Sequence, residues 1–312
     1  MKKNLVFLLT ILLFSCNSDD TDTREFNFAL EEVYSISQVS AFVKFSSLEV
    51  DADYSLAIYK SSDLYSQVDS LEGVHPNKPI SLCYLEPSTN YLIKLYALKE
   101  DHISPPKTME FLTDEVGVDD QTIVVEVTNP ATGRTWMDRN LGAERVSQAI
   151  NDSRSYGDLY QWGRRADGHE KRASAVTQEN ATTVQPGHGM FISGNATWND
   201  SQNFNLWEGV DAINNPCPCG FRLPTQQELI DELETWNTKD ANGALLSELK
   251  FSLTGYRANA DGSVASEGNF GYYWSSEASD MSGLDLGINQ TNAHPSSHHQ
   301  AGGASVRCIK DY

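Results

Sequence analysis

Three cysteines in the C-terminal half of the chain are of a type that could carry chemistry. Cys217 and Cys219 stand two residues apart, and Cys308 lies near the end of the sequence. A pair of free thiolates would suit a soft copper ion. In an exported chain, cysteines this far apart favour a long-range disulfide, with either Cys217 or Cys219 as the partner of Cys308. Such a bridge leaves one thiol alone, so we expect no copper site and no other cofactor.

Two further sets have residue types that bind metal ions. Residues 198–200 spell the WND triplet of sugar-binding C-type lectins, but the Glu-Pro-Asn or Gln-Pro-Asp loop that precedes it in those proteins is absent here. We therefore expect Trp198 in the core and no calcium site. His294, His298 and His299 lie among Asn, Pro, Ser and Gly, with no Asp or Glu among the flanking residues. We interpret them as solvated histidines of a surface loop, and we expect no metal site there.

Carboxylates at suitable spacing could support hydrolysis by acid–base catalysis. The candidates are Asp261, Glu267, Glu277 and Asp280. No two of them have a spacing that demands this role, and Asp261 followed by Gly262 is typical of a hairpin turn. Thr225 and Glu228 fit a capping box, and apolar residues then recur on one face, which predicts a helix over 226–237. Glu228 is therefore predicted to cap this helix rather than to act as a general acid.

The C-terminal half is rich in aromatic and small polar residues. All six Trp residues follow residue 121, together with many Gly and Asn, which predicts a loop-rich domain held by aromatic packing. Its distinctive blocks are WMDRNLGA at 136–143, YGDLYQWGR at 156–164, NNPCPCGFRLPTQQE at 214–228, GYYWSS at 271–276 and SVRC at 305–308. As a set, these blocks resemble the Fibrobacter succinogenes major paralogous domain, a family grouped with the C-type-lectin-like and formylglycine-generating-enzyme-like folds.

The resemblance implies an α+β C-type-lectin-like domain over residues 121–312. It also favours the disulfide between Cys217 and Cys308, with Cys219 free, while the pairing of Cys219 with Cys308 remains the alternative. By analogy with the lectin-like fold, we expect residues 280–303 to form a loop on the ligand-binding face. No individual binding residue is assigned. The charges of Arg139 and Asp158 are expected to pair within the aromatic core.

Residues 25–114 predict an all-β domain. Short apolar runs separated by polar residues indicate strands within 39–46, 53–60, 91–98 and 108–113. The stretch from Leu85 to Tyr91 resembles a corner of a fibronectin type III domain, in which the Tyr ring enters the core and its hydroxyl meets a backbone group. Phe42 or Phe45 should replace the Trp that is usual in that family. Cys83 stands alone in this domain, so we expect a small buried side chain and assign it no role.

The first residues predict export and lipidation. Lys2 and Lys3 precede a short apolar run, and residues 1–15 are typical of a signal peptide. The sequence LFSC ending at Cys16 resembles a bacterial lipobox, which implies lipidation of Cys16 and a lipidated tether over 16–24. The acidic residues after Cys16 resemble the surface-export tag of lipoproteins in the Bacteroidetes. We expect an outer-membrane lipoprotein that is anchored by lipid and exposed at the cell surface.

Charge and organisation limit the possible functions. The formal net charge of −20 disfavours a nucleic-acid partner, since phosphate binding depends on Lys and Arg. Residues 115–120 are predicted to link the two domains. We expect a multidomain, non-catalytic, surface-anchored lipoprotein, with an all-β fibronectin type III-like sandwich followed by the α+β domain, that binds or adheres to glycan or protein. The alternatives are an oxidase of the formylglycine-generating type and a purely structural component of the cell surface.

Overall fold

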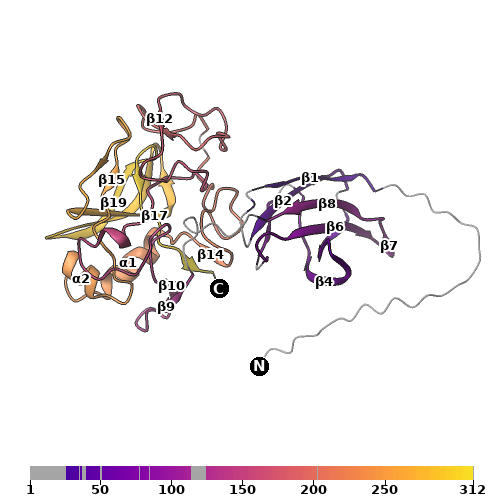
Figure 1. Ribbon diagram of the computed structural model, residues 1–312, viewed down its shortest axis with the longest axis horizontal. Helices are drawn as coiled ribbons and strands as arrows, with labels where there is room; N and C mark the ends of the chain where they lie inside the picture. The colour runs from indigo at the N-terminus through magenta and orange to yellow at the C-terminus, as the bar shows by residue number, and fades with distance from the viewer. Residues whose placement is uncertain are drawn as a thin grey trace, which may run out of the picture.

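The computed structural model describes residues 26–34, 36, 40–49, 51–76, 78–83, 85–113, 124–201 and 203–311. They form an N-terminal and a C-terminal part, which lie side by side along the long axis of the molecule (Figure 1). The signal peptide, Cys16, the tether and the 115–120 linker fall outside these residues and stay predictions. Across the described chain, no helix has the length and apolar character needed to span a bilayer.

The N-terminal part is a sandwich of two antiparallel sheets. One has the order β1-β2-β5, and the other has the order β4-β3-β6-β7, with β8 also pairing with β6. The strands are β1 (Phe28–Tyr34), β2 (Ala41–Ser47), β3 (Asp53–Lys60), β4 (Asp63–Glu72), β5 (Ile80–Leu82), β6 (Asn90–Lys99), β7 (His102–Ile103) and β8 (Lys107–Leu112). The four strands predicted from alternation correspond to β2, β3, β6 and β8. The arrangement is consistent with a fibronectin type III-like sandwich.

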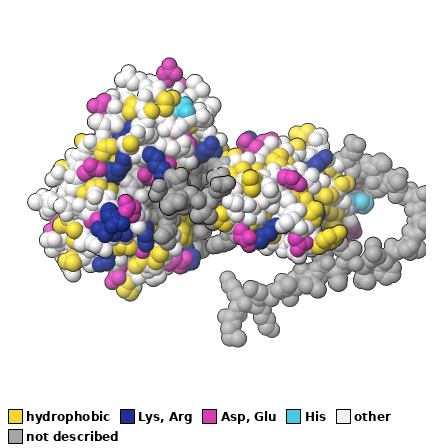
Figure 2. All heavy atoms as spheres, in the orientation of Figure 1, with side chains coloured by type: hydrophobic (Ala, Val, Ile, Leu, Met, Phe, Trp, Pro, Cys, Tyr) yellow, Lys and Arg dark blue, Asp and Glu magenta, His cyan; other side chains and the backbone are white. Residues whose placement is uncertain are grey.

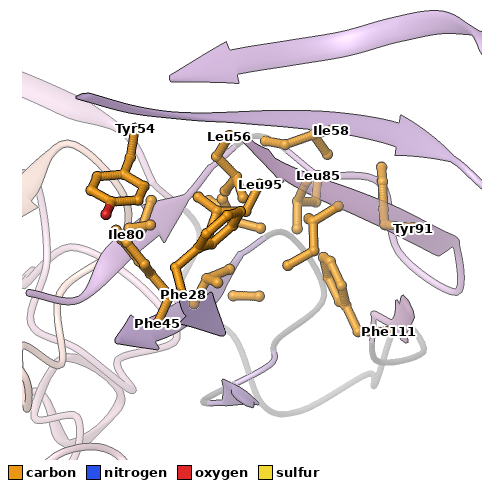
Figure 3. Close-up of a cluster of buried hydrophobic side chains, with 14 of the residues drawn as sticks. Phe28, Phe45, Tyr54, Leu56, Ile58, Ile80, Leu85, Tyr91, Leu95 and Phe111 are labelled. Carbon is orange, nitrogen blue, oxygen red and sulfur yellow. The ribbon is translucent and has the colours of Figure 1, made fainter. Parts of the chain in front are cut away.

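Apolar side chains from both sheets meet between them and form one core (Figure 3). Tyr91 is fully enclosed, and its hydroxyl accepts a hydrogen bond of 2.8 Å from the backbone N–H of Glu86. This contact confirms the predicted tyrosine corner. Phe45 is buried against Tyr54, whereas Phe42 is only half-buried, so Phe45 takes the place of the missing Trp.

In the described residues, the C-terminal part combines many short strands with two short α-helices and one short 3-10 helix. Its sheets have the orders β14-β21-β10-β9, β11-β20-β15-β16, β12-β13 and β17-β18-β19. The strands are β9 (Glu126–Thr128), β10 (Thr135–Met137), β11 (Tyr160–Gln161), β12 (Val176–Thr177), β13 (Phe191–Ile192), β14 (Phe221–Arg222), β15 (Tyr256–Arg257), β16 (Val264–Ala265), β17 (Phe270–Ser279), β18 (Ser282–Asn289), β19 (Ala293–His299), β20 (Gly303–Ala304) and β21 (Ile309–Lys310). The helices are η1 (Ser153–Ser155), α1 (Gln226–Glu234) and α2 (Ala241–Leu246).

Helix α1 begins as predicted. Thr225 accepts from the backbone N–H of Glu228, and the Glu228 carboxylate accepts from the backbone N–H of Thr225, which confirms the capping box. The helix ends at Glu234, three residues earlier than predicted. Its apolar stripe packs in one core cluster with Leu286 and Ile288 of β18. The helix therefore covers one face of the β17-β18-β19 sheet.

The prediction of a loop over residues 280–303 is wrong. This segment contains β18 and β19, which pair in antiparallel register from Ser282 with His299 to Ile288 with Ala293. Strand β19 reads AHPSSHH, which has no alternating apolar residues, so the sequence carries no periodic signal for a strand here. His294, His298 and His299 are therefore strand residues rather than residues of a flexible loop. Residues opposite each other on paired strands point to the same face of the sheet, so the register between β18 and β19 shows on which face each histidine lies.

Candidate functional site

The structure resolves the cysteine pairing. Cys217 is bonded to Cys308, with 5.9 Å between their Cα atoms. Cys219 is bonded to Cys83, with 5.5 Å between their Cα atoms, so the predictions of a free Cys219 and of a solitary Cys83 are wrong. The alternative bridge between Cys219 and Cys308 is excluded by the same pairing. Sequence could not show this link because its two cysteines belong to different domains, and spacing does not define connectivity.

The predicted ion pair between Arg139 and Asp158 is also wrong. Arg139 makes a two-pronged pair with its neighbour Asp138, at 2.7 and 3.0 Å, while Asp158 pairs with Lys171 at 3.1 Å. A carboxylate on the preceding residue reaches the guanidinium with little loss of side-chain freedom, so it competes effectively with a partner from another segment. These charges are accounted for by pairing and offer no free acid or base.

A buried cluster of Asp167, His169 and Glu170 has side-chain atoms close enough to hold a metal ion. The Nε2 atom of His169 accepts a 3.0 Å hydrogen bond from the backbone N–H of Gln161. The proton must then lie on Nδ1, which donates to Asp167 at 2.8 Å. Both ring nitrogens are thus engaged, and burial lowers the pKa of His169 to about 4. We interpret the cluster as a structural network around a neutral histidine.

The face of the β17-β18-β19 sheet that lies opposite helix α1 carries a different arrangement. On β17 the residues on this face are Phe270, Tyr272 and Trp274. Trp274 lies opposite Asp285 on β18, and Asp285 lies opposite Ser296 on β19. Side chains that face each other across paired strands project from the same side of the sheet. Aromatic rings and a carboxylate are thereby brought onto one surface.

The aromatic rings of this face are aligned. Phe270 and Tyr272 are stacked, with ring centroids 6.2 Å apart and planes inclined by 9°. Tyr256 of β15 meets the edge of Tyr272, and the His298 ring lies 4.0 Å from it. Phe270 is 38% exposed and Tyr272 is half-buried, so both can reach a ligand. We call Tyr256, Phe270, Tyr272, Asp285 and His298 the aromatic face.

Asp285 provides the charged centre of the aromatic face. It is fully buried, and its Oδ2 atom lies 2.6 Å from Nδ1 of His298. Burial raises the pKa of Asp285, and the hydrogen bond from His298 offsets part of that effect. Within the described chain, Oδ1 of Asp285 is enclosed and has no hydrogen-bond partner of good geometry. Because Asp285 fixes Nδ1, the Nε2 atom of His298 is the ring nitrogen left to face a ligand.

Two tryptophan rings pack over Gly283, on the same side of the sheet as the aromatic face. A Cβ atom at Gly283 would lie 2.5 Å from the Trp162 ring and 2.9 Å from the Trp274 ring, so glycine lets both rings pack against β18. The indole N–H of Trp274 donates to the carbonyl of Tyr160 at 2.7 Å, and that of Trp162 donates to the carbonyl of Ser275 at 3.0 Å. These two hydrogen bonds tie β17 to the segment that contains Tyr160 and Trp162.

The other sequence candidates have structural surroundings. Trp198 is fully buried, as predicted, and donates to the carbonyl of Trp162 at 2.7 Å. Asp261 accepts from Ser263 in the turn between β15 and β16, which confirms the predicted hairpin turn. Glu267 pairs with Arg172, and Glu277 accepts from the backbone N–H of Gln226. Each of these three carboxylates has its own partner, and none of these contacts joins two of them in an acid–base pair.

The sequence interpretation missed Tyr256 and Asp285 altogether, and it placed His298 in a loop. One pattern could have drawn attention to the face. Phe270, Tyr272 and Trp274 alternate along the chain, which is typical of a strand with aromatic residues on one side. The charge of Asp285 within an otherwise apolar run is the other sign, since a buried carboxylate needs a partner.

Comparisons with known proteins leave the family open. No family model matches the chain, and no curated protein matches it. A fibronectin type III domain from the human KIAA0970 protein is 18% identical, covers 30% of this chain and 77% of that one, and has a TM-score of 0.25. The sensor domain of the anti-sigma factor RsgI4 in Pseudobacteroides cellulosolvens is 20% identical, with coverages of 32% and 83% and a TM-score of 0.25. We transfer no function from either structure.

Proposed function

We propose that this protein is a non-catalytic, surface-anchored lipoprotein whose C-terminal domain binds an uncharged glycan through the aromatic face. The observation that carries the proposal is the parallel stack of Phe270 and Tyr272, both open to solvent, beside the buried pair of Asp285 and His298. Ring faces of this kind pack well against the C–H faces of sugars, and a fixed imidazole nitrogen can hydrogen-bond a hydroxyl. A protein ligand is the alternative occupant of the same surface.

The charge of the region favours an uncharged ligand. No Lys or Arg occurs in the sequence between Arg257 and Arg307, the stretch that contains β16 to β20. A carboxylated or sulfated glycan at the aromatic face would find no compensating Lys or Arg from this stretch. Elsewhere, basic and acidic side chains are interspersed on both parts of the molecule (Figure 2). Anionic ligands are therefore expected to bind more weakly than neutral ones.

The rest of the proposal rests on the sequence. The aromatic blocks of residues 136–143 and 156–164 resemble the Fibrobacter succinogenes major paralogous domain and support a C-type-lectin-like assignment for the C-terminal domain. The lipobox ending at Cys16 supports an outer-membrane anchor with the domains facing outward. Cys217 and Cys219 are each bonded to a different partner, so an oxidase with a two-thiol copper site would require both bridges to be broken. This pairing favours the binding function over the oxidase.

A glycan array tests the proposal. The full chain is applied to arrayed neutral and acidic oligosaccharides, and any neutral ligand found is then measured by calorimetry. Tyr272→Ala should weaken binding about tenfold or more, since a central aromatic contact contributes above about 1 kcal/mol. Tyr65→Ala is the matched control, because Tyr65 is a fully exposed aromatic residue on β4 of the other domain. No neutral ligand, or equal binding by Tyr272→Ala, would refute the proposal.

A further inference from the structure

The disulfide between Cys83 and Cys219 joins the two domains. Cys83 follows β5 at one edge of the sandwich, and Cys219 precedes β14 in the C-terminal part, 136 residues later in the chain. The hydrophobic cores of the two domains are separate, since the sandwich cluster contains residues up to Phe111 and the clusters of the C-terminal part begin at Val127. This bridge therefore contributes to the orientation of the domains rather than to either core.

A cavity of about 200 Å³ opens beside this bridge. Residues of both domains line it, including Phe42 and Ser81 from the sandwich and Asp211 from the C-terminal domain. Cys83 and Cys219 are part of its wall, and both are half-buried rather than enclosed. A cavity of this volume can admit part of a small molecule, so a low-molecular-weight compound can approach the sulfur atoms of Cys83 and Cys219.

The second bridge has a different environment. Cys308 is fully buried and packs in a core cluster with Trp207 and Val306. Although Cys217 lies at the same cavity, its sulfur is bonded to an enclosed partner. Opening that bond would place a thiolate in an apolar core, which is costly. The two disulfides should thus differ in their susceptibility to reduction, as exposed bridges are the labile ones.

Local hydrogen bonding supports opening of the bridge between the domains. The Ser81 hydroxyl lies 3.4 Å from Sγ of Cys83 and 3.7 Å from Sγ of Cys219. The sulfurs carry no proton in the disulfide, so the hydroxyl is the donor. The Leu82 carbonyl lies 3.6 Å from Sγ of Cys219 and can accept from its thiol once the bond is cut. The site therefore provides partners for both reduced sulfurs.

We propose that the bridge between Cys83 and Cys219 is a thiol-sensitive lock between the domains, opened by small thiol compounds that enter this cavity. A thiolate attacks Sγ of Cys219, forms a mixed disulfide with it and expels Cys83 as a thiolate next to Ser81. A second thiolate attacks the sulfur of the bound compound, which leaves as a disulfide and releases Cys219 as a thiolate. Two thiols are oxidised, the protein disulfide is reduced, and the protons of the two thiols end on Cys83 and Cys219.

Opening the lock removes the covalent restraint on domain orientation. Noncovalent groups at the junction remain, such as Lys78 and Asp211, whose charges lie near enough to interact. A single charge pair at the surface contributes little to stability and does not replace a covalent bond. The reduced protein should therefore sample more domain orientations, while both cores stay folded.

Timed reduction of the full chain tests this proposal. The protein is incubated with reduced glutathione, quenched with iodoacetamide and analysed by peptide mass spectrometry. Cys83 and Cys219 should become alkylated roughly tenfold faster or more than Cys217 and Cys308, because access controls the exchange rate. Ser81→Ala should slow this opening by a few-fold, since the leaving thiolate loses its donor. Equal rates of alkylation for the two cysteine pairs, or faster reduction of the bond between Cys217 and Cys308, would show that access to the cavity does not control reduction and would overturn the proposal.

Small-angle X-ray scattering supplies the second measurement. After selective reduction, the radius of gyration should rise, and the Cys83→Ser/Cys219→Ser double variant should show the same rise without any thiol. The matched control is wild-type protein incubated with oxidised glutathione, which has no free thiol and should leave the scattering unchanged. An unchanged radius of gyration in both the reduced protein and the double variant would show that the bridge does not lock the domains.

Discussion

The imidazole of His298 donates from Nδ1 to the buried carboxylate of Asp285 across 2.6 Å, at the centre of the aromatic face. The two residues come from neighbouring strands, β19 and β18, and the Tyr272 ring packs against the imidazole at 4.0 Å between centroids. Asp285 thus sets which nitrogen of His298 faces outward, and His298 satisfies one oxygen of a carboxylate that is otherwise enclosed. The orientation of the His298 ring and the environment of the Asp285 carboxylate therefore depend on each other.

Replacing His298 with Phe separates the packing of its ring against Tyr272 from its hydrogen bond to Asp285. The ring of Phe can still pack against Tyr272, but the carboxylate of Asp285 loses its 2.6 Å hydrogen bond from His298. We expect a loss of about 1–3 kcal/mol in the free energy of unfolding at neutral pH, because a buried acceptor is left unsatisfied. The His298→Phe/Asp285→Asn double variant should recover part of this loss, since no charge remains buried. Strictly additive losses in denaturant unfolding would contradict this coupling.

The corner at Tyr91 gives a prediction for the sandwich. Tyr91→Phe keeps the ring in the core but leaves the backbone N–H of Glu86 without its 2.8 Å partner. We expect a loss of about 1–3 kcal/mol in the unfolding free energy, which scanning calorimetry should show as a lower transition temperature of the sandwich. Tyr65→Phe removes a hydroxyl from a fully exposed ring and should change little. If both variants unfold like the wild type, the corner contributes nothing measurable.

Local patterns in the sequence predict the elements whose stability is local. The alternation of residues 53–60, the corner at Tyr91 and the cap at Thr225 depend on neighbours a few residues away, and the structure confirms all three. The bond between Cys83 and Cys219 depends on the packing of two domains, which no spacing encodes. The same holds for Asp285, because its partner is defined by strand register rather than by sequence distance.

Two glycines on β18 should respond differently to substitution. A Cβ atom at Gly283 would overlap the rings of Trp162 and Trp274, whereas at Gly287 it would make only ordinary contacts of 3.4 Å or more, nearest to the Tyr272 ring. We expect Gly283→Ala to lower the unfolding free energy by about 1–3 kcal/mol, because a packed core resists added volume. Gly287→Ala, on the same strand and face, should cost under about 1 kcal/mol. Tryptophan fluorescence during denaturant unfolding measures both, and equal losses would contradict the packing described for Trp162.

His169 should make the stability of the C-terminal domain depend on pH. Burial lowers its pKa from 6.5 to about 4, so the folded state holds a neutral imidazole where the unfolded chain binds a proton. The resulting stability is fully present above pH 6.5 and is lost as the pH falls through about 4, a change of about 3 kcal/mol. His169→Gln should flatten this part of the profile, at the cost of a lower unfolding free energy at pH 7. His75→Gln, at an exposed histidine, should leave the profile unchanged. Tryptophan-monitored unfolding between pH 4 and 7 distinguishes them, and a profile of His169→Gln as steep as that of the wild type would assign the pH dependence to another group.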